Sequence, residues 1–297
     1  MRSASWPGPR PNSCGTASSM MLRQVSLTVL VDDRAGTGLV SEHGWSLWIE
    51  TGDRRILFDT GQGAALLANA QRLGIALDKT DILVLSHGHY DHTGGVSGVL
   101  TQARKIEVYC HPAAFQPRYR LRGGTPRPIG MPPETLIALD RLPIQRLHWV
   151  SRPVKFSPGL GLTGPIPRKT NYEDSGGPFY LDLGGKRADP FEDDQALWID
   201  TPGGLIVCVG CCHAGLVNTL NYVCRLSGTS RVRALIGGFH LVQASAQRLQ
   251  RTAAALLGYS PGLVAPCHCT GKRAIQALRK ALGDRVAPGR AGRIYRL

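Results

Sequence analysis

Three histidines and one aspartate stand within six consecutive positions of this chain. They are His87, His89, Asp91 and His92, in the run His-Gly-His-Tyr-Asp-His. Imidazole nitrogens and carboxylate oxygens are ligands that zinc takes at about 2.0 to 2.2 Å. The run therefore predicts a metal centre, and the alternative is a polar histidine-rich turn that binds nothing.

The segments on either side of this run predict how it is held. Residues 82–85 are all apolar, have the length of a buried strand and end at Ser86. A helix is expected at about 94–100, so the loop that carries the histidines would be fixed at both ends. Rigid flanking elements of this kind are what a preorganised set of ligands requires.

Hydrophobic periodicity predicts strands and helices along the rest of the chain. Strands are expected at 25–31, 47–50, 55–59, 106–110, 147–150, 161–164, 196–200, 205–209, 232–236, 263–265 and 293–297. Helices are expected at 63–73, 215–226, 243–257 and 272–282. This order of elements favours sheets that are covered by helices.

The composition is that of a folded protein, because 42% of the 297 residues are apolar and can bury a substantial core. Residues 1–20 are rich in Ser, Pro, Gly and Arg and lack any acid. We expect them to form a disordered extension before one domain at 21–297. No apolar run fits a membrane span or a secretory signal, so we expect a cytoplasmic protein without a membrane partner. The oligomeric state is left open.

The segment at 112–135 interrupts the pattern with six prolines, several glycines and four arginines, which are Arg118, Arg120, Arg122 and Arg127. A long insertion inside a compact domain is usually a functional lid or a surface loop. We therefore consider two roles, an anion-attracting lid over the site and a solvated loop.

Five of the eight cysteines gather near histidines instead of spreading along the chain as a disulfide framework. They are Cys208, Cys211, Cys212, Cys267 and Cys269. We expect reduced thiols, and the preferred interpretation is that they are small buried residues near strand ends. The alternative is a non-catalytic sensor in which these thiols surround a metal.

The run at 86–95, Ser-His-Gly-His-Tyr-Asp-His-Thr-Gly-Gly, resembles the signature of the metallo-β-lactamase-fold superfamily of metal-dependent hydrolases. Leu-Phe-Asp-Thr-Gly at 57–61 and later glycine-flanked His and Cys segments follow in the same order. The similarity covers about residues 22–297. It implies an α/β (α+β) fold, an αββα sandwich of two mixed β-sheets flanked by helices, with the site at one edge between the sheets.

Local runs at 42–46, 163–168, 210–215, 237–241 and 266–271 resemble a narrower branch of this superfamily. Its members are described as 7,8-dihydropterin-6-methyl-4-(β-D-ribofuranosyl)aminobenzene-5′-phosphate synthases, of the methanopterin pathway. The branch implies a transferase that joins a dihydropterin-methyl diphosphate to an aminobenzene ribosyl phosphate through a C–N bond and releases diphosphate.

The superfamily resemblance also implies ligands. His87 and His89 would hold one metal, while Asp91 and His92 would hold a second one. Two metals about 3.5 to 4 Å apart can stabilise the attacking and leaving oxygens of a displacement. We expect one or two divalent ions, zinc first, with manganese or iron as alternatives.

Later ligands are harder to assign from the sequence. Gly210-Cys211 stands where relatives carry Gly-Asp with a bridging aspartate. Cys211 could replace that carboxylate as a thiolate, or His213 could supply a nitrogen. Our preference is His213 at the first metal and His268 at the second, and His240 competes with His268 for the last position.

Other residues are expected around these ligands. Asp59 would accept the second N–H of a ligand histidine, which fixes the orientation of the ring. His43, His240 and Tyr90 are candidates for the pocket wall or for structural hydrogen bonds. Arg168 and Lys169 are candidates for binding an anionic substrate, since Arg presents a planar fork to phosphate.

The net charge of +14 arises from 35 basic against 21 acidic residues and would attract partners that carry phosphate. Nuclease branches of the superfamily carry a long extra domain, whereas here the core fold takes up the chain. We therefore expect a small, anionic substrate and no nucleic acid.

The leading functional hypothesis is a hydrolase in which a metal-bound hydroxide attacks a small phosphorylated or pterin-like substrate, with Asp91 and His213 as catalytic ligands. The transferase described above and the non-catalytic thiol sensor are the alternatives.

Overall fold

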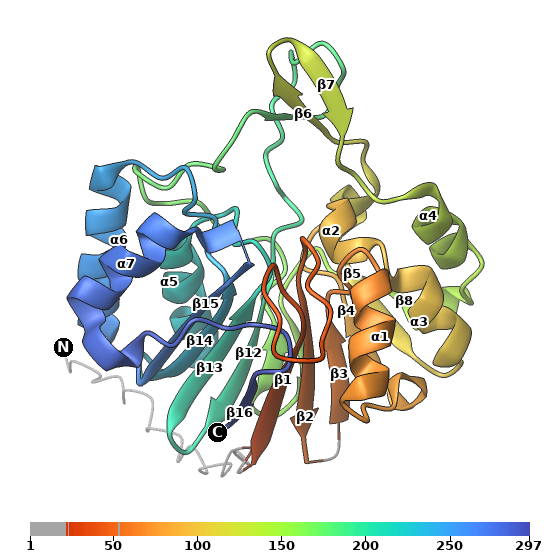
Figure 1. Cartoon of the computed structure of the whole chain (residues 1–297), viewed down its shortest axis with the longest axis horizontal. Helices are drawn as coiled ribbons and strands as arrows, with labels where there is room; N and C mark the ends of the chain where they lie inside the picture. Colours follow the sequence, from red (N-terminus) through yellow and green to blue (C-terminus); the bar gives the residue numbers. More distant parts are fainter. Residues whose placement is uncertain (1–21, 23, 53) are drawn as a thin grey trace, which may run out of the picture.

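The structure is a computed structural model that describes residues 22, 24–52 and 54–297. The extension expected at 1–20 lies outside the described residues. Two large β-sheets face each other, and helices cover the outer face of each sheet (Figure 1). These four layers confirm the αββα sandwich.

The first sheet has seven strands in the order β16-β1-β2-β3-β4-β5-β8. The strands are β1 (Val25–Val31), β2 (Ser46–Thr51), β3 (Arg54–Phe58), β4 (Ile82–Val84), β5 (Glu107–Cys110), β8 (Leu147–Trp149) and β16 (Ile294–Arg296). Strands β3, β4, β5 and β8 run parallel to one another, and the other neighbours pair antiparallel. On its outer side lie α1 (Ala64–Arg72), α3 (Val96–Gln102) and α4 (Pro133–Asp140) (Figure 1).

The second sheet has six strands in the order β15-β14-β13-β12-β10-β9. The strands are β9 (Val154–Ser157), β10 (Leu160–Leu162), β12 (Ala196–Thr201), β13 (Gly204–Val209), β14 (Val232–Gly238) and β15 (Leu263–Cys267). Strands β13, β14 and β15 are parallel. Their outer face carries α5 (Leu216–Ser227), α6 (Ala246–Tyr259) and α7 (Lys272–Leu282) (Figure 1).

Three apolar clusters hold these layers together. The middle cluster joins the two sheets and includes Ile49 and Phe58 from the first, with Leu197 and Ile236 from the second. The other two clusters lie between each sheet and its helices. Because strands β4, β13, β14 and β15 are buried, their ends are held firmly where the chain leaves the sandwich.

The segment at 112–135 is more regular than the sequence suggested. It contains the 3₁₀ turn Pro112–Phe115, the strands β6 (Tyr119–Arg122) and β7 (Thr125–Pro128), and the start of α4. These strands join β11 (Phe179–Tyr180) in a small sheet of order β11-β6-β7, above one edge of the sandwich (Figure 1). The prolines misled the prediction because β7 is an edge strand, where a missing N–H is tolerated.

The metal-binding run also differs from the expected loop. Its second half forms a short helical turn, α2 (Tyr90–Thr93). The helix expected at about 94–100 is present as α3, two residues later. The remaining 3₁₀ turns are Leu77–Lys79, Ile144–Arg146, His268–Thr270 and Gly283–Arg285. Within the described ranges, every helix is too short or too polar to cross a lipid bilayer.

Candidate metal centre

The candidate ligands lie beyond the carboxyl ends of four strands. His87 and His89 follow β4, Cys211 and His213 follow β13, and later segments follow β14 and β15. Neighbouring parallel strands end at the same edge of a sheet, so these segments meet in one place. The two sheets thus bring together residues that lie up to about 180 positions apart.

Cys211 belongs to two groups of candidate ligands. In one group the donor atoms of His87, Cys211 and His213 lie within 4.8 Å of one another. In the other group the donor atoms of His92, Cys211 and His268 meet the same condition. Cys211 therefore occupies a position from which its sulfur could contact two ions.

Each group has a further donor beside it. Nε2 of His87 lies 3.0 Å from Nδ1 of His89, in the first group. Oδ2 of Asp91 lies 3.5 Å from Nε2 of His268, in the second group. Each half of the site therefore offers three side chains in addition to Cys211.

Hydrogen bonds behind the rings aim their free nitrogens into the site. Nδ1 of His92 donates to Oδ2 of Asp59 at 2.7 Å. Oγ of Ser86 donates to the same oxygen at 2.6 Å and lies 2.9 Å from Nδ1 of His87. Nδ1 of His213 donates to the carbonyl of Ser175 at 3.0 Å. Such outer contacts fix the tautomer and orientation of ligand histidines.

The electrostatics of these rings fit a cation. Burial lowers the pKa of His87, His89 and His213, so the rings are neutral and carry a free lone pair. Nε2 of His213 is buried and has no hydrogen-bond partner. An unsatisfied buried acceptor of this kind is costly unless another group, such as a metal ion, satisfies it.

Sequence reasoning missed Asp33, which supports the second half of the site. Its two carboxylate oxygens accept hydrogen bonds from Nδ1 of His268 at 2.6 Å and from Nδ1 of His43 at 3.2 Å. Although burial alone would raise the pKa of Asp33, these two bonds hold it below its usual value. The sequence signal that could have indicated Asp33 is the pair of acids that follows the first strand, at positions 32 and 33.

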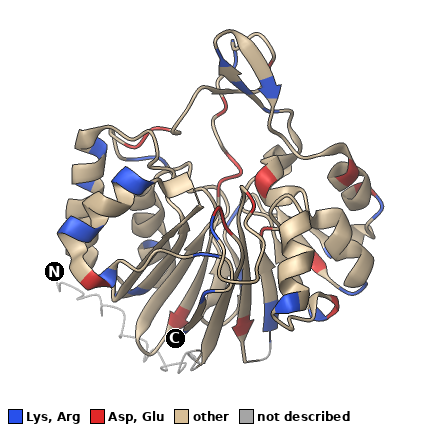
Figure 2. Cartoon of the chain, viewed as in Figure 1, with Lys and Arg blue, Asp and Glu red and all other residues tan. Residues whose placement is uncertain are grey.

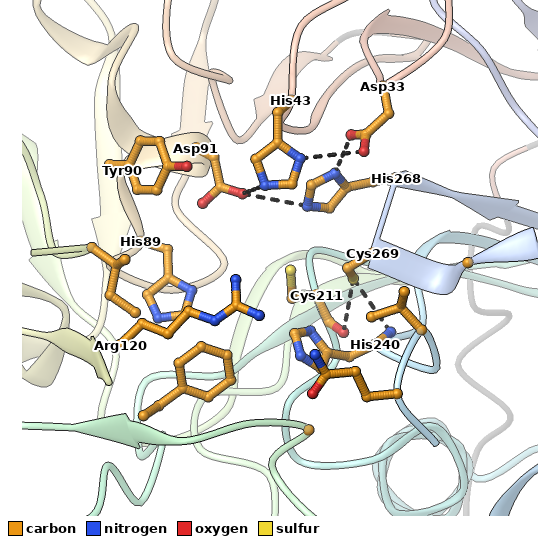
Figure 3. Close-up of a pocket in the computed structure, with 16 residues that line it drawn as sticks. Asp33, His43, His89, Tyr90, Asp91, Arg120, Cys211, His240, His268 and Cys269 are labelled. Atoms are coloured by element: carbon orange, nitrogen blue, oxygen red, sulfur yellow. Dashed lines mark hydrogen bonds and ion pairs between the residues drawn. The ribbon is translucent and has the colours of Figure 1, made fainter. Parts of the chain in front are cut away.

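The ligands open onto a cavity of about 280 Å³ (Figure 3). Its wall includes three candidates from the sequence, Tyr90, His43 and His240, together with Asp33, His89, Asp91, Arg120, Ile129, Gly176, Phe179, Cys211, Val242, Gln243, His268, Cys269 and Gly271. Nε2 of His43 lies 3.3 Å from Oδ2 of Asp91. The cavity is large enough for part of a small organic molecule next to the ligands.

Both histidines that competed for the last position reach this cavity. His268 lies beside Asp91 and His92, within the second ligand group. The ring of His240 lies 4.3 Å from that of His213, and its Nδ1 is buried without a partner. His240 forms a third group of possible ligands with Cys211 and Cys269.

Arg168 and Lys169 do not line the cavity. Nη1 of Arg168 donates to the carbonyl of His213 at 2.9 Å, so this residue supports the backbone of a candidate ligand. The backbone N–H of Lys169 donates to Oδ1 of Asn218. Among the described lining residues, Arg120 is the one arginine or lysine.

The five clustered cysteines fall into two kinds. Cys208, Cys212 and Cys267 belong to the apolar clusters, as expected for small buried residues. Cys211 and Cys269 line the cavity instead. None of the five forms a disulfide.

Comparisons with known proteins show which family the chain belongs to. Residues 41–217 match the Metallo-beta-lactamase superfamily. The chain is 33% identical over 294 residues to 7,8-dihydropterin-6-methyl-4-(beta-D-ribofuranosyl)-aminobenzene-5'-phosphate synthase of Methanocaldococcus jannaschii, covering 92% of this chain and 96% of the relative.

Two solved structures share the architecture. One is Tm1679, described as a metal-dependent hydrolase of the beta-lactamase superfamily, with a TM-score of 0.77 and 29% identity over 92% of this chain and 99% of the other. The other is the metallo-beta-lactamase fold protein YhfI of Bacillus subtilis. It has a TM-score of 0.54 and 12% identity over 92% of this chain and 100% of the other, and shows the fold alone. The chain thus belongs to the metallo-β-lactamase superfamily, as a metal-dependent hydrolase or a related transferase.

Proposed function

We propose that this enzyme is a hydrolase that uses two divalent metal ions, preferably zinc, on a small phosphorylated or pterin-like substrate. The observation that supports it most strongly is the position of Cys211 between two groups of donors. His87, His89 and His213 would hold one ion, and Asp91, His92 and His268 the other. Cys211 would donate its thiolate to both, in place of a bridging carboxylate.

The chemistry of the donors favours zinc. Imidazole, thiolate and carboxylate together suit a borderline metal, whereas magnesium and calcium prefer oxygen ligands. When bound, such ions polarise an ester or phosphoryl oxygen and activate water for attack. His87 and His213, being neutral, are ready to bind a cation without first losing a proton.

The open side of the cavity would handle the substrate. His43 lies there, next to Asp91, and its hydrogen bond to Asp33 raises its pKa above 6.5. The protonated, hydrogen-bond-donating form of His43 is therefore favoured beside Asp91. Tyr90 and Phe179 provide a partly aromatic wall that suits a planar ring such as a pterin.

The second candidate is the C–N bond-forming transferase that releases diphosphate. Similarity to the synthase over nearly the full length of both chains favours it. In that reaction the ions held by these donors would bind the leaving diphosphate, in place of the phosphoryl group or ester of a hydrolysed substrate. The sensor hypothesis is set aside, because the chain is an enzyme and three of the clustered cysteines lie in the core.

Two assays on protein purified without chelator test these proposals. In the first, zinc-, manganese- or iron-loaded enzyme is incubated with a panel of phosphomonoesters, phosphodiesters and lactones. We expect turnover that chelation abolishes, and the absence of turnover across the whole panel would contradict hydrolysis.

In the second assay, diphosphate release is measured with a dihydropterin-methyl diphosphate and an aminobenzene ribosyl phosphate. Release that depends on both substrates identifies the transferase.

A further inference from the structure

The hairpin of β6 and β7 carries three arginines on one face. Arg120 lies directly opposite Arg127 in the antiparallel pair, and Arg122 lies two residues further along β6. Directly paired residues and alternate residues of a strand share one face of a sheet. Residues 119–128 include no acid, and Figure 2 shows basic residues on this hairpin.

This arrangement leaves positive charge without compensation. Like charges directly opposite each other destabilise a sheet. Within the described part of the chain, Arg120, Arg122 and Arg127 form no ion pair with an acidic side chain. Burial and the two neighbouring arginines lower the pKa of Arg120. An anion bound at this face would remove the repulsion.

Arg118, on the same segment, differs from these three arginines because its guanidinium is paired with carboxylates. Its Nε donates to Asp189 at 2.6 Å, and its two terminal nitrogens donate to Asp193 at 2.8 and 2.6 Å. The chain thus supplies two carboxylates to neutralise one arginine and none for Arg120, two positions later. The free charge of Arg120 is available to a ligand.

Arg120 faces the candidate metal centre. It lines the cavity with His89 and Cys211, and its guanidinium points toward their side chains in Figure 3. Nε of Arg120 is buried and has no hydrogen-bond partner. Phe179, its direct partner on β11, packs its ring 5.6 Å from that of His89, so this face of the small sheet is directed at the ligands.

The base of the hairpin is attached to the metal-binding run at two points. Oδ2 of Asp193, which pairs with Arg118, also accepts the N–H of Gly88 at 2.8 Å. The N–H of Tyr90 donates to the carbonyl of Ile129 at 3.0 Å. These contacts hold Arg120 at a set position relative to the ligand histidines, which is what preorganised recognition requires.

We propose that Arg120 recognises a phosphate group on the substrate and thereby determines the specificity of the cavity. This inference rests on the proposed function. A guanidinium binds two phosphate oxygens at once through parallel N–H groups. Arg120 lines the cavity, and Arg122 and Arg127 lie beside it on the same face of the hairpin. Their added positive charge favours a multiply charged group, a phosphate or diphosphate, over a singly charged carboxylate. Arg120 takes the role that the sequence suggested for Arg168 and Lys169.

Binding of inorganic diphosphate to the full-length, metal-loaded protein tests this proposal by calorimetry. The variants are R120Q and R120K, and the matched control is R279Q, which removes the same charge from the exposed end of α7. We expect R120Q to weaken binding about 10- to 100-fold, as for loss of a charge-assisted bidentate contact, with R120K in between. R279Q should change affinity less than about twofold, because exposed distant charges are screened.

Metal content is measured for every variant, so that a loss of the ions is not mistaken for a loss of Arg120. A diphosphate affinity of R120Q within about twofold of that of the wild type, at equal metal content, would overturn the inference.

Measurements of turnover distinguish a failure of this inference from a failure of the proposed hydrolase function. If the wild type turns over phosphorylated esters and R120Q keeps the same KM, the inference fails and the function stands. If R120Q loses diphosphate binding but no ester or lactone is turned over, the inference stands and hydrolysis fails.

Discussion

Nδ1 of His92 donates a hydrogen bond to Oδ2 of Asp59 at 2.7 Å, and both side chains are fully buried. The same oxygen accepts a bond from Oγ of Ser86, which in turn contacts Nδ1 of His87. His87 belongs to the first group of candidate ligands and His92 to the second. One carboxylate therefore orients a histidine in each half of the site.

Replacing Asp59 with Asn should weaken metal binding about 10- to 100-fold, because the amide cannot orient both rings as the carboxylate does. The backbone at Asp59 has a φ of 62°, a conformation that Asn tolerates well, so the fold should survive. Zinc affinity is measured by competition with a chromogenic chelator. Asp81→Asn, in an ion pair with Arg55 near the surface, is the control. Equal zinc affinity of Asp59→Asn and wild type would contradict the orienting role.

Cys211 offers a spectroscopic test of the bridging thiolate. In the cobalt-substituted protein, the wild type should show a thiolate-to-cobalt charge-transfer band, since thiolate ligands bind such metals as the deprotonated sulfur. Cys211→Ser should lose the band and one equivalent of metal. Cys211→Asp should lose the band but keep two equivalents, because a carboxylate can bridge two ions.

Cys212→Ser is the matched control for Cys211. Cys212 is buried in the apolar cluster beside Thr219 and is not among the residues that line the cavity. Its replacement should leave the band unchanged. A band that persists in Cys211→Ser and disappears in Cys212→Ser would show that the assignment of the bridging sulfur is wrong.

Arg118→Met should destabilise the protein by about 3 to 5 kcal/mol, because it leaves the buried carboxylates of Asp189 and Asp193 without their cation. The free energy of unfolding is measured in urea. Arg55→Met breaks the partly exposed pair with Asp81 and should cost about 0 to 1 kcal/mol. Similar losses in the two variants would contradict the difference in burial.

Asp194 should make stability depend on pH. Burial raises its pKa from 3.8 to about 7, while its Oδ2 accepts the N–H of Ala214. The folded state therefore holds this proton more tightly than the unfolded state. The stability that results is present below pH 3.8 and is lost as pH rises through about 7. Asn keeps the hydrogen-bond acceptor and lacks the charge. The free energy of unfolding of Asp194→Asn should therefore increase relative to that of the wild type as pH rises.

Urea unfolding of the metal-free protein at pH 5 and pH 8 measures this difference. Asp78→Asn, at an exposed site, is the control and should show the same offset from wild type at both values. The prediction fails if Asp194→Asn also keeps a constant offset. Metal-free protein is used because a bound cation would itself lower the pKa of nearby carboxyls.

The sequence predicted the parts of the site that are local. His87 to His92 follow a buried strand within a few positions, so the run and its strand could be recognised together. The partners of these residues come from distant segments. Asp33 meets His268 across 235 positions, and Asp193 meets Gly88 across 105. No pattern within one segment indicates such pairs.

The dependence on distant segments also explains why the sequence indicated Arg168 and not Arg120 as the basic residue of the cavity. Arg168 is the last residue of a run typical of the branch, yet its side chain supports the backbone of His213. Arg120 belongs to a proline-rich segment whose hairpin of β6 and β7 pairs with β11, about 60 residues later. Its place in the cavity follows from that long-range pairing, which periodicity along one segment cannot reveal.

Metal stoichiometry tests the central claim most directly. Protein purified without chelator is analysed by plasma mass spectrometry, together with His213→Ala and His268→Ala, which belong to different groups of donors. We expect two equivalents of metal in the wild type and about one in each variant, since each loses a ligand of one ion. A wild type without bound metal, or two equivalents retained in both variants, would contradict the two-ion site around Cys211.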